Sequence, residues 1–163
     1  MAADAASLRP ATRADVGLLL AFIRELGDFE RLAHEVVVDA TVLADSLFGA
    51  RPAAEAVIAE VDGDAAGFAL FFHNFSTFHG RRGLYLEDLY VRPAFRARGI
   101  GRQLMRHLAR TAVERGCARF EWSVLDWNTD AIAFYRELGA VGLDGWTVQR
   151  VDGDALQRLA AAA

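Results

Sequence analysis

The residues with the clearest chemical signature in this chain form a short turn with two glycines, Arg96-Ala97-Arg98-Gly99-Ile100-Gly101. A β-patterned run, Leu84 to Val91, precedes this turn, and an amphipathic helix pattern begins near Gly101. Backbone amides at a helix N-terminus have no intrahelical partner and carry the positive end of the helix dipole. Glycines in such a turn remove the β-carbons that would keep phosphate groups away from those amides. The spacing therefore favours a phosphate-binding turn, R-x-x-G-x-G, although glycines could equally serve the backbone geometry of a strand-turn-helix junction.

Two further patterns accompany the turn. The strand before it reads YLEDLYV from Tyr85 to Val91, and downstream Asp126-Trp127-Asn128 is followed by AIAFYRELGA from Ala131 to Ala140. Together these segments resemble the acetyl-CoA-binding region of the GNAT superfamily of N-acetyltransferases. The combination of Y-L-E-D-x-aromatic-V with W-N and F-Y is similar to the spermidine/spermine and thialysine N-acetyltransferase branch of that superfamily. More faintly, the resemblance extends from Leu8 to the last helix.

The resemblance implies acetyl-CoA as the cosubstrate. Its diphosphate would rest on the backbone amides of the turn, with Arg98 or Arg102 adding a charge-assisted contact unless these arginines only form a solvated helix face. The amide-rich pantetheine arm would pair with the strand edge from Leu89 to Val91, where a backbone amide would also stabilise the oxyanion. Asn128, which is equally a good helix N-cap, would complete the groove with the first turn of its helix. The predicted cofactor-binding residues are Leu89, Tyr90, Val91, Arg96, Ala97, Arg98, Gly99, Ile100, Gly101, Arg102, Asn128 and Ala131.

Two side chains are candidates for proton transfer. Tyr135 is the predicted general acid, because a phenol with a pKa of about 10 can protonate a departing thiolate without being ionised at neutral pH. The alternative for Tyr135 is packing beside Phe134. An amine acceptor arrives mostly as ammonium, and Glu87 is the predicted base that removes its proton, directly or through water.

The acceptor itself would meet carboxylates. Asp88 could attract the ammonium group, but adjacent strand residues point to opposite faces, so Glu87 and Asp88 share one site only if a bulge or bend breaks the alternation. GNAT proteins are known for such a bulge in this strand. In the resembled diamine enzymes an aromatic-acid pair contacts the amine; here that pair is Phe29-Glu30, with phenylalanine where those enzymes commonly carry tyrosine. The predicted substrate-binding residues are Phe29, Glu30, Glu87, Asp88 and Trp122, the last of which could equally be a core residue.

The elements that must position these residues follow from local patterns. Strands are predicted for 7–11, 56–61, 66–75, 84–91 and 120–125, with a hairpin at Asp62-Gly63 and a final β region over 141–151 that Gly145 interrupts. Helices are predicted after the capping box of Thr12 to Asp15, from Asp39 to Gly49, and over 101–115, 128–138 and 152–162. The predicted fold is α/β (α+β), a GNAT fold with a central mixed, mostly antiparallel sheet of six to seven strands flanked by helices.

Composition narrows the class of protein. The 163 residues are 53% apolar, which suits one domain over 1–163, and the formal net charge of -4 argues against a nucleic-acid partner. A single cysteine, Cys117, excludes an internal disulfide, and the four histidines show no metal-ligand spacing. The stretch from Met1 to Ala6 lacks a secretory pattern, and the longest apolar runs fall short of the roughly 18 residues that a membrane span needs. We therefore expect a cytoplasmic protein without a metal or a membrane partner.

The leading interpretation is an acetyl-CoA-dependent N-acetyltransferase that acts on a primary amine of a small cationic acceptor, such as a diamine, a polyamine or a lysine-like amino acid. Direct attack in a ternary complex is favoured, because Cys117 follows a helix-ending glycine and offers no acyl-cysteine route. The alternatives are a peptide or protein amine acetyltransferase and a non-catalytic acyl-CoA-binding sensor. The resemblance also implies a homodimer, with the run from Gly145 to Val151 as a strand at the interface.

Overall fold

The computed structural model describes residues 6–162. Residues 1–5, on which the expectation about a secretory signal mainly depends, and residue 163 lie outside the described residues. The chain forms two compact units, one up to Ser123 and one from Val124 onward. Within residues 6–162, no helix combines the length and the apolar character needed to cross a membrane.

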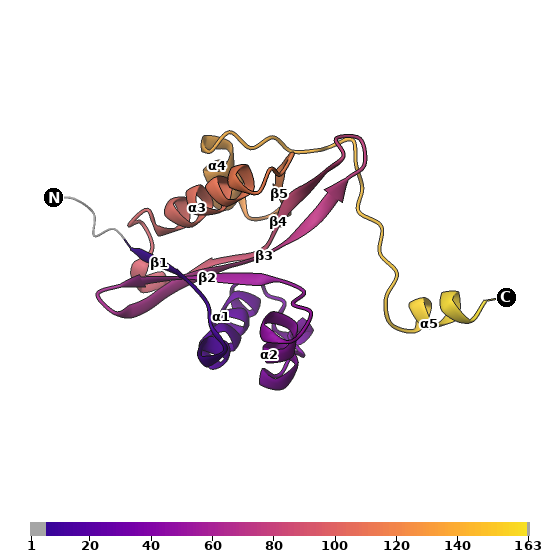
Figure 1. The fold of residues 1–163 in the computed structure, drawn as a ribbon, viewed down its shortest axis with the longest axis horizontal. Coiled ribbons are helices and arrows are strands. Elements are labelled where there is room, and N and C mark those ends of the chain that lie inside the picture. Colours follow the sequence, from indigo (N-terminus) through magenta and orange to yellow (C-terminus); the bar gives the residue numbers. More distant parts are fainter. Residues whose placement is uncertain (1–5, 163) are drawn as a thin grey trace. The chain divides into compact units, whose positions relative to one another are not determined.

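The first unit is built on a five-stranded sheet in the order β1-β2-β3-β4-β5 (Figure 1). Its strands are β1 (Ser7–Pro10), β2 (Glu55–Val61), β3 (Asp64–Ser76), β4 (Arg81–Val91) and β5 (Phe120–Trp122). Neighbouring strands are antiparallel except β4 and β5, which are parallel. The prediction of a mixed, mostly antiparallel sheet flanked by helices is confirmed.

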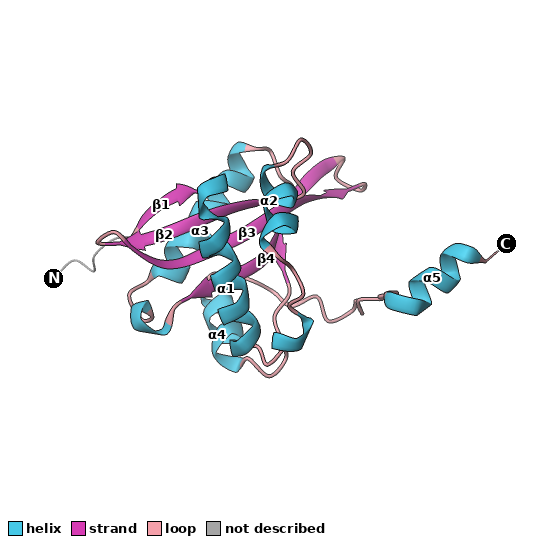
Figure 2. Cartoon of the chain, turned by 90° about the horizontal axis from the view of Figure 1, so that it is seen from below, coloured by secondary structure: helices cyan, strands magenta, loops and turns pink. Residues whose placement is uncertain are grey.

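Helices cover both faces of this sheet. Helices α1 (Val16–Phe29) and α2 (Ala40–Phe48) lie on one face, which is seen directly in Figure 2, and α3 (Ile100–Glu114) lies on the other (Figure 1). Short 3-10 turns occur at Arg13–Asp15, Ala33–Glu35 and Pro93–Phe95. Under α1, the ring of Phe22 stacks on Phe68 with centroids 5.1 Å apart, and both side chains are fully buried. On the opposite face Leu104 and Leu108 of α3 are also fully buried, so each face of the sheet has its own apolar contact layer.

Several boundaries follow from the local signals in the sequence. Asp39 caps α2, because its Oδ1 accepts a hydrogen bond of 2.8 Å from the amide of Val42. Asp62 and Gly63 have φ values of 53° and 87°, as the tight turn between β2 and β3 requires. These predictions are confirmed.

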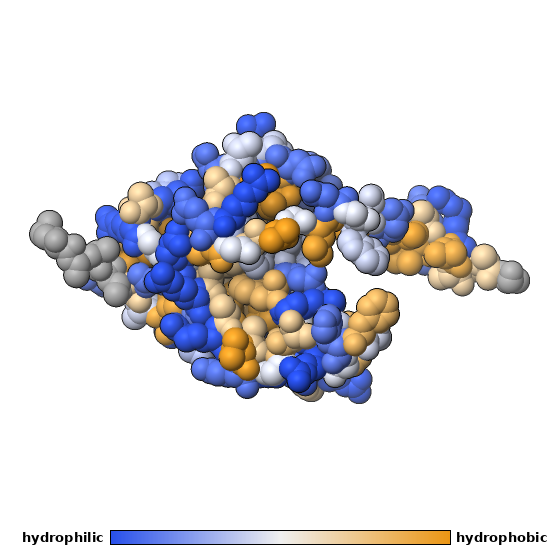
Figure 3. All heavy atoms as spheres, turned by 90° about the horizontal axis from the view of Figure 1, so that it is seen from above, coloured by the Kyte–Doolittle hydropathy of each residue, from blue (hydrophilic) through white to orange (hydrophobic). Residues whose placement is uncertain are grey.

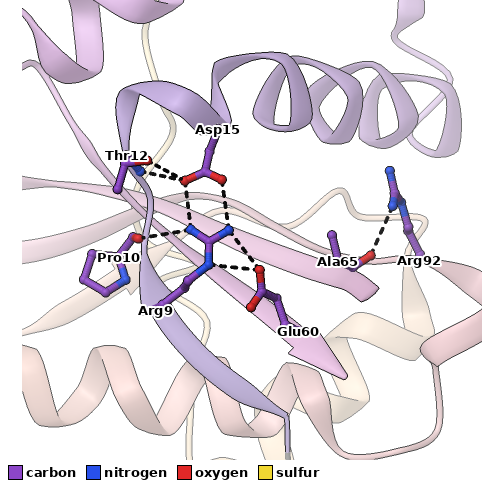
Figure 4. A network of polar contacts seen from close by, with 7 residues as sticks. All are labelled: Arg9, Pro10, Thr12, Asp15, Glu60, Ala65 and Arg92. Carbon is purple, nitrogen blue, oxygen red and sulfur yellow. Dashed lines mark hydrogen bonds and ion pairs between the residues drawn. The ribbon is translucent and has the colours of Figure 1, made fainter. Parts of the chain in front are cut away.

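One part-buried ion network ties β1 to the rest of the sheet (Figure 4). The Arg9 guanidinium donates to both carboxylate oxygens of Asp15, at 2.8 and 2.9 Å, and to Glu60 at 2.9 Å. Hydrogen bonds from Arg9 and from Thr12 lower the pKa of Asp15 to about 2. The network therefore ties β1 and the turn before α1 to the end of β2.

The second unit contains α4 (Thr129–Glu137) and α5 (Gly153–Ala161). Asn128 is the N-cap of α4, and its side chain accepts the amide hydrogen of Ala131 at 3.2 Å. The predicted β region over Val141–Val151 is wrong, because these residues form no strand, and the sheet has five strands rather than six to seven. A strand requires a partner, and this segment instead leaves Val141, Trp146 and Val148 each more than 80% exposed.

Candidate active site

A β-bulge lies at the centre of the candidate site. In the pairing of β3 with β4, Leu70 is opposite Asp88 while its neighbour Phe71 is opposite Leu86, so Glu87 is an extra residue in β4. The insertion breaks the alternation of side chains along the strand. Glu87 and Asp88 consequently line the same pocket, which is the arrangement that a regular strand would not allow.

This pocket has a volume of about 360 Å³ and combines an apolar wall with four carboxylates. The apolar wall comes from the end of α1 and the segment that follows it: Ile23, Leu26, Gly27, Leu32, Val36, Val37 and Val38. The carboxylates are Glu30, Glu35, Glu87 and Asp88, and none of the described lining residues is basic. A pocket with this lining attracts cations that carry an aliphatic chain.

The surroundings of the pocket shift the pKa of two of its carboxyls, Asp88 and Glu30. Burial, followed by repulsion from Glu87 and Glu30, raises the pKa of the half-buried Asp88 carboxyl from 3.8 to about 7. Burial also raises the pKa of Glu30. Strongly perturbed carboxyls in a concave site are typical of functional positions.

The end of α1 shapes the apolar wall. Its last turn closes with hydrogen bonds from Leu32 N–H to Gly27 O at 2.8 Å and from Arg31 N–H to Asp28 O at 3.1 Å, with Arg31 at φ 61°. This reversal brings Val36 over Gly27, where an added β-carbon would lie 2.7 Å from Val36 Cγ2. A larger residue at position 27 would therefore force the Val36 side chain to shift.

Beyond the bulge, β4 has an open edge. β5 pairs with β4 only at Leu84, Tyr85 and Leu86, so the predicted strand over 120–125 ends at Trp122, where the bulge begins. From Glu87 to Val91, β4 keeps β3 on one side, and no strand in residues 6–162 pairs with its other side. This edge includes Leu89 to Val91, the segment predicted to receive an amide-rich ligand.

The predicted phosphate-binding turn follows this open edge. Ala97 and Gly99 both have left-handed backbone conformations, with φ values of 61° and 77°. Gly99 is the N-cap of α3, whose first helical hydrogen bond runs from Gln103 N–H to Gly99 O at 3.0 Å. The amides of Ile100 and Gly101 precede that bond and therefore point outward from the helix start. Left-handed residues in such a turn bring neighbouring amides together into a concavity that binds anions, and an added β-carbon at Gly99 would meet nothing within 4 Å.

The remaining predicted residues are distributed as follows. Phe29 is not among the pocket-lining residues, and its ring instead lies 4.8 Å from the Arg96 guanidinium. Trp122 ends β5, with its ring 4.9 Å from that of Phe120. Tyr135 lies on α4 in the second unit, and its ring centroid is 5.3 Å from that of Phe134.

Sequence reasoning missed the apolar wall and the contact of the Arg96 side chain. The wall had a detectable signal, because Ile23, Leu26 and Gly27 follow one another at helical spacing next to Glu30. No local signal reports the contact between Phe29 and Arg96. Among residues 6–162, no three His, Cys, Asp or Glu side chains are grouped so as to hold a metal ion.

Comparison with known proteins gives a consistent result. Residues 22–140 match the Acetyltransferase (GNAT) family. The chain is 37% identical to thialysine N-epsilon-acetyltransferase of Mus musculus, over 94% of this chain and 96% of that protein. It is 32% identical to L-ornithine N5-acetyltransferase of Arabidopsis thaliana, over 93% of this chain and 86% of that protein.

Among solved structures, an integron cassette protein from the mobile metagenome of V. cholerae superimposes with a TM-score of 0.82 at 25% identity, covering 97% of this chain and 99% of that one. The family match spans most of the chain and includes the bulged strand, the turn and α4. The chain therefore belongs to the GNAT family of acetyltransferases and is an N-acetyltransferase.

Proposed function

We propose that this enzyme transfers an acetyl group from acetyl-CoA to a primary amine of a small cationic acceptor, by direct attack in a ternary complex. The acceptor class is a diamine, a polyamine or a lysine-like amino acid. The observation that carries the proposal is the bulge at Glu87, which brings Glu87 and Asp88 into one pocket with Glu30 and Glu35. Thialysine and ornithine, the acceptors named for two relatives, each carry a primary amine on a short chain, which suits an acidic pocket with aliphatic walls.

The turn and the open edge of β4 fit acetyl-CoA, which when bound supplies an acetyl group activated as a thioester. The amides from Arg96 to Arg102 would hold the diphosphate, with the exposed Arg98 adding a charge-assisted contact. The edge of β4 from Leu89 to Val91, which no strand within the described residues covers and where Val91 O accepts a hydrogen bond from Arg96, offers backbone donors and acceptors to the amides of the pantetheine arm. Asn128 and Ala131, at the start of α4, are proposed to complete this groove.

The proton transfers are assigned to two side chains. Glu87 is exposed at the bulge and would accept the proton of the ammonium group, directly or through water. Asp88 and Glu30 would hold the positive charge of the acceptor beside it. The Tyr135 hydroxyl would donate its proton toward the departing sulfur, and a backbone amide on the β4 edge would stabilise the oxyanion. Trp122 is proposed as a wall of the amine site.

The experiment that tests this function is steady-state release of CoA from acetyl-CoA with spermidine, putrescine, thialysine, ornithine, lysine and a lysine-bearing peptide. We expect turnover on at least one small amine, and we expect Tyr135→Phe to lower kcat on it at least about tenfold with little change in acetyl-CoA affinity. Tyr85→Phe is the matched control, because it also removes a tyrosine hydroxyl. That hydroxyl shares a hydrogen bond of 2.9 Å with Ser123 Oγ and has no proposed role in proton transfer. Turnover on the peptide alone would replace the small-amine proposal, and acetyl-CoA binding without any turnover would indicate a sensor.

We also propose that the enzyme is a cytoplasmic homodimer in which both units act as one acetyltransferase domain. The family match crosses the boundary between the units, and a lone cysteine suits a reducing compartment. Apolar side chains on the second unit favour a protein partner: Val141, Trp146 and Val148 are exposed, and Figure 3 shows apolar residues on the surface of α5, where Leu159 is 63% exposed. A second copy of the chain is the proposed partner.

A further inference from the structure

One side-chain stack joins the phosphate-binding turn to α1. The Arg96 guanidinium lies 4.8 Å from the ring centroid of Phe29 and 5.8 Å from that of Tyr90. The same guanidinium donates through Nε to Val91 O at 2.9 Å, so it also binds the end of the open β4 edge. Arg96 is the residue at which the turn begins, and its side chain therefore sets the position of that turn against α1 and β4.

Phe29 occupies the other end of this stack. It is the last residue of α1, and Glu30, the next residue, lines the acceptor pocket. Phe29 itself is absent from the pocket lining, although its side chain is partly exposed. The Phe29 ring thus contacts the side chain of the first residue of the turn, while the next residue, Glu30, lines the acceptor pocket.

We infer that Phe29 is a positioning residue and not an acceptor contact: through Arg96 it couples the turn that holds the cosubstrate phosphates to the Glu30 wall of the acceptor pocket. This inference rests on the proposed function. Binding of the cosubstrate fixes the turn and with it Arg96, Phe29 and the end of α1. Coupling between two sites is reciprocal, so an acceptor held by Glu30 strengthens cosubstrate binding by the same factor.

The size of the coupling follows from the kind of contact. A cation-π contact at a partly exposed site corresponds to a factor of about two to five in an equilibrium constant. Leucine at position 29 would keep apolar contact but lose the ring face that attracts the guanidinium. Tyrosine would keep that face and add a hydroxyl. Phe29→Tyr therefore distinguishes a stacking role from a direct acceptor contact: the stack on Arg96 would be preserved, whereas a surface that touched the acceptor would be altered.

The test measures the Kd of coenzyme A by calorimetry, with and without a saturating concentration of the panel amine that the wild-type enzyme turns over fastest. In the wild type we expect the amine to lower the Kd of coenzyme A by about two- to fivefold. In Phe29→Leu we expect the amine to leave that Kd unchanged, and in Phe29→Tyr we expect the wild-type ratio together with an unchanged KM for the amine. Phe78→Leu, at a fully exposed phenylalanine beyond β3, is the matched control and should retain the ratio.

Three results would overturn the inference while leaving the proposed function intact. The first is a wild-type Kd of coenzyme A that does not depend on the amine. The second is a Phe29→Leu variant in which the amine still lowers the Kd of coenzyme A by the wild-type factor. The third is a severalfold change of the amine KM in Phe29→Tyr. If Phe29 had a purely structural role, Phe29→Leu would weaken the binding of coenzyme A and of the amine equally. The ratio of the coenzyme A Kd without the amine to that with the amine would then stay at the wild-type value. Failure of the wild type to turn over any amine would remove the proposed function and this inference with it.

Discussion

Replacement of Asp88 by asparagine is expected to change how the stability of the protein depends on pH. Burial and the neighbouring Glu87 and Glu30 raise the pKa of Asp88 from 3.8 to about 7. Each pKa unit corresponds to about 1.36 kcal/mol, so a difference of about 3 units means that the folded state disfavours the ionised carboxylate by about 4 kcal/mol. Because the carboxyl is only half-buried and water screens part of the repulsion, we expect about 2–4 kcal/mol.

The sign follows from proton binding. The folded state holds the Asp88 proton more tightly than the unfolded chain does, so this residue lowers stability as the pH rises from about 4 to about 7. Below pH 4 the carboxyl is protonated in both states and carries no such penalty. Asparagine cannot ionise, so Asp88→Asn should gain stability relative to the wild type as the pH increases through this range.

Urea denaturation near pH 4 and near pH 8 provides the measurement. The free energy of unfolding of Asp88→Asn, relative to the wild type, should be about 2–4 kcal/mol more favourable at the higher pH. Asp64→Asn is the matched control, because Asp64 is an exposed aspartate at the start of β3. If Asp88→Asn and Asp64→Asn showed the same pH-independent difference, the claim that the pocket disfavours a charged Asp88 would be refuted.

Two further predictions concern the turn and the second unit. Gly99→Ala places a β-carbon on a residue at φ 77°, so it should lower the free energy of unfolding by about 1 kcal/mol. It should also weaken the binding of acetyl-CoA, measured by calorimetry. An unchanged Kd would show that the amides of the turn do not hold the phosphates. Trp146→Ser removes a large exposed apolar side chain from the proposed interface, so light scattering should show a shift from dimer to monomer. A wild-type monomer would contradict the dimer itself.

Elements that carry their own start and stop signals could be predicted from the sequence. Helix α2 has Asp39 as its cap and Gly49 at its end, and the hairpin has Asp62 and Gly63 in its turn. Each signal acts through hydrogen bonds or backbone conformations within a few residues. The segment over 141–151 shows the opposite case, because a β pattern becomes a strand only where another strand pairs with it.

The same distinction applies within the site. The turn at Gly99 could be predicted because glycine spacing and a helix start are local features. The bulge at Glu87 was accessible only through the family resemblance, since an extra residue leaves no mark in a strand until its partner is known. The stack of Arg96 on Phe29 joins residues far apart in the sequence, and only the folded sheet brings them together.

The bulge also makes the pairing of β3 with β4 independent of the residue that is proposed as the base. Leu86 and Asp88 already face consecutive residues of β3, so removal of Glu87 alone would leave the pairing on both sides in register. A one-codon deletion at this position would therefore erase the proposed base and preserve the sheet, the open edge and the turn at Gly99. Such a variant would keep the proposed cosubstrate groove but lack the proposed base, so a single deleted residue would separate cosubstrate binding from turnover.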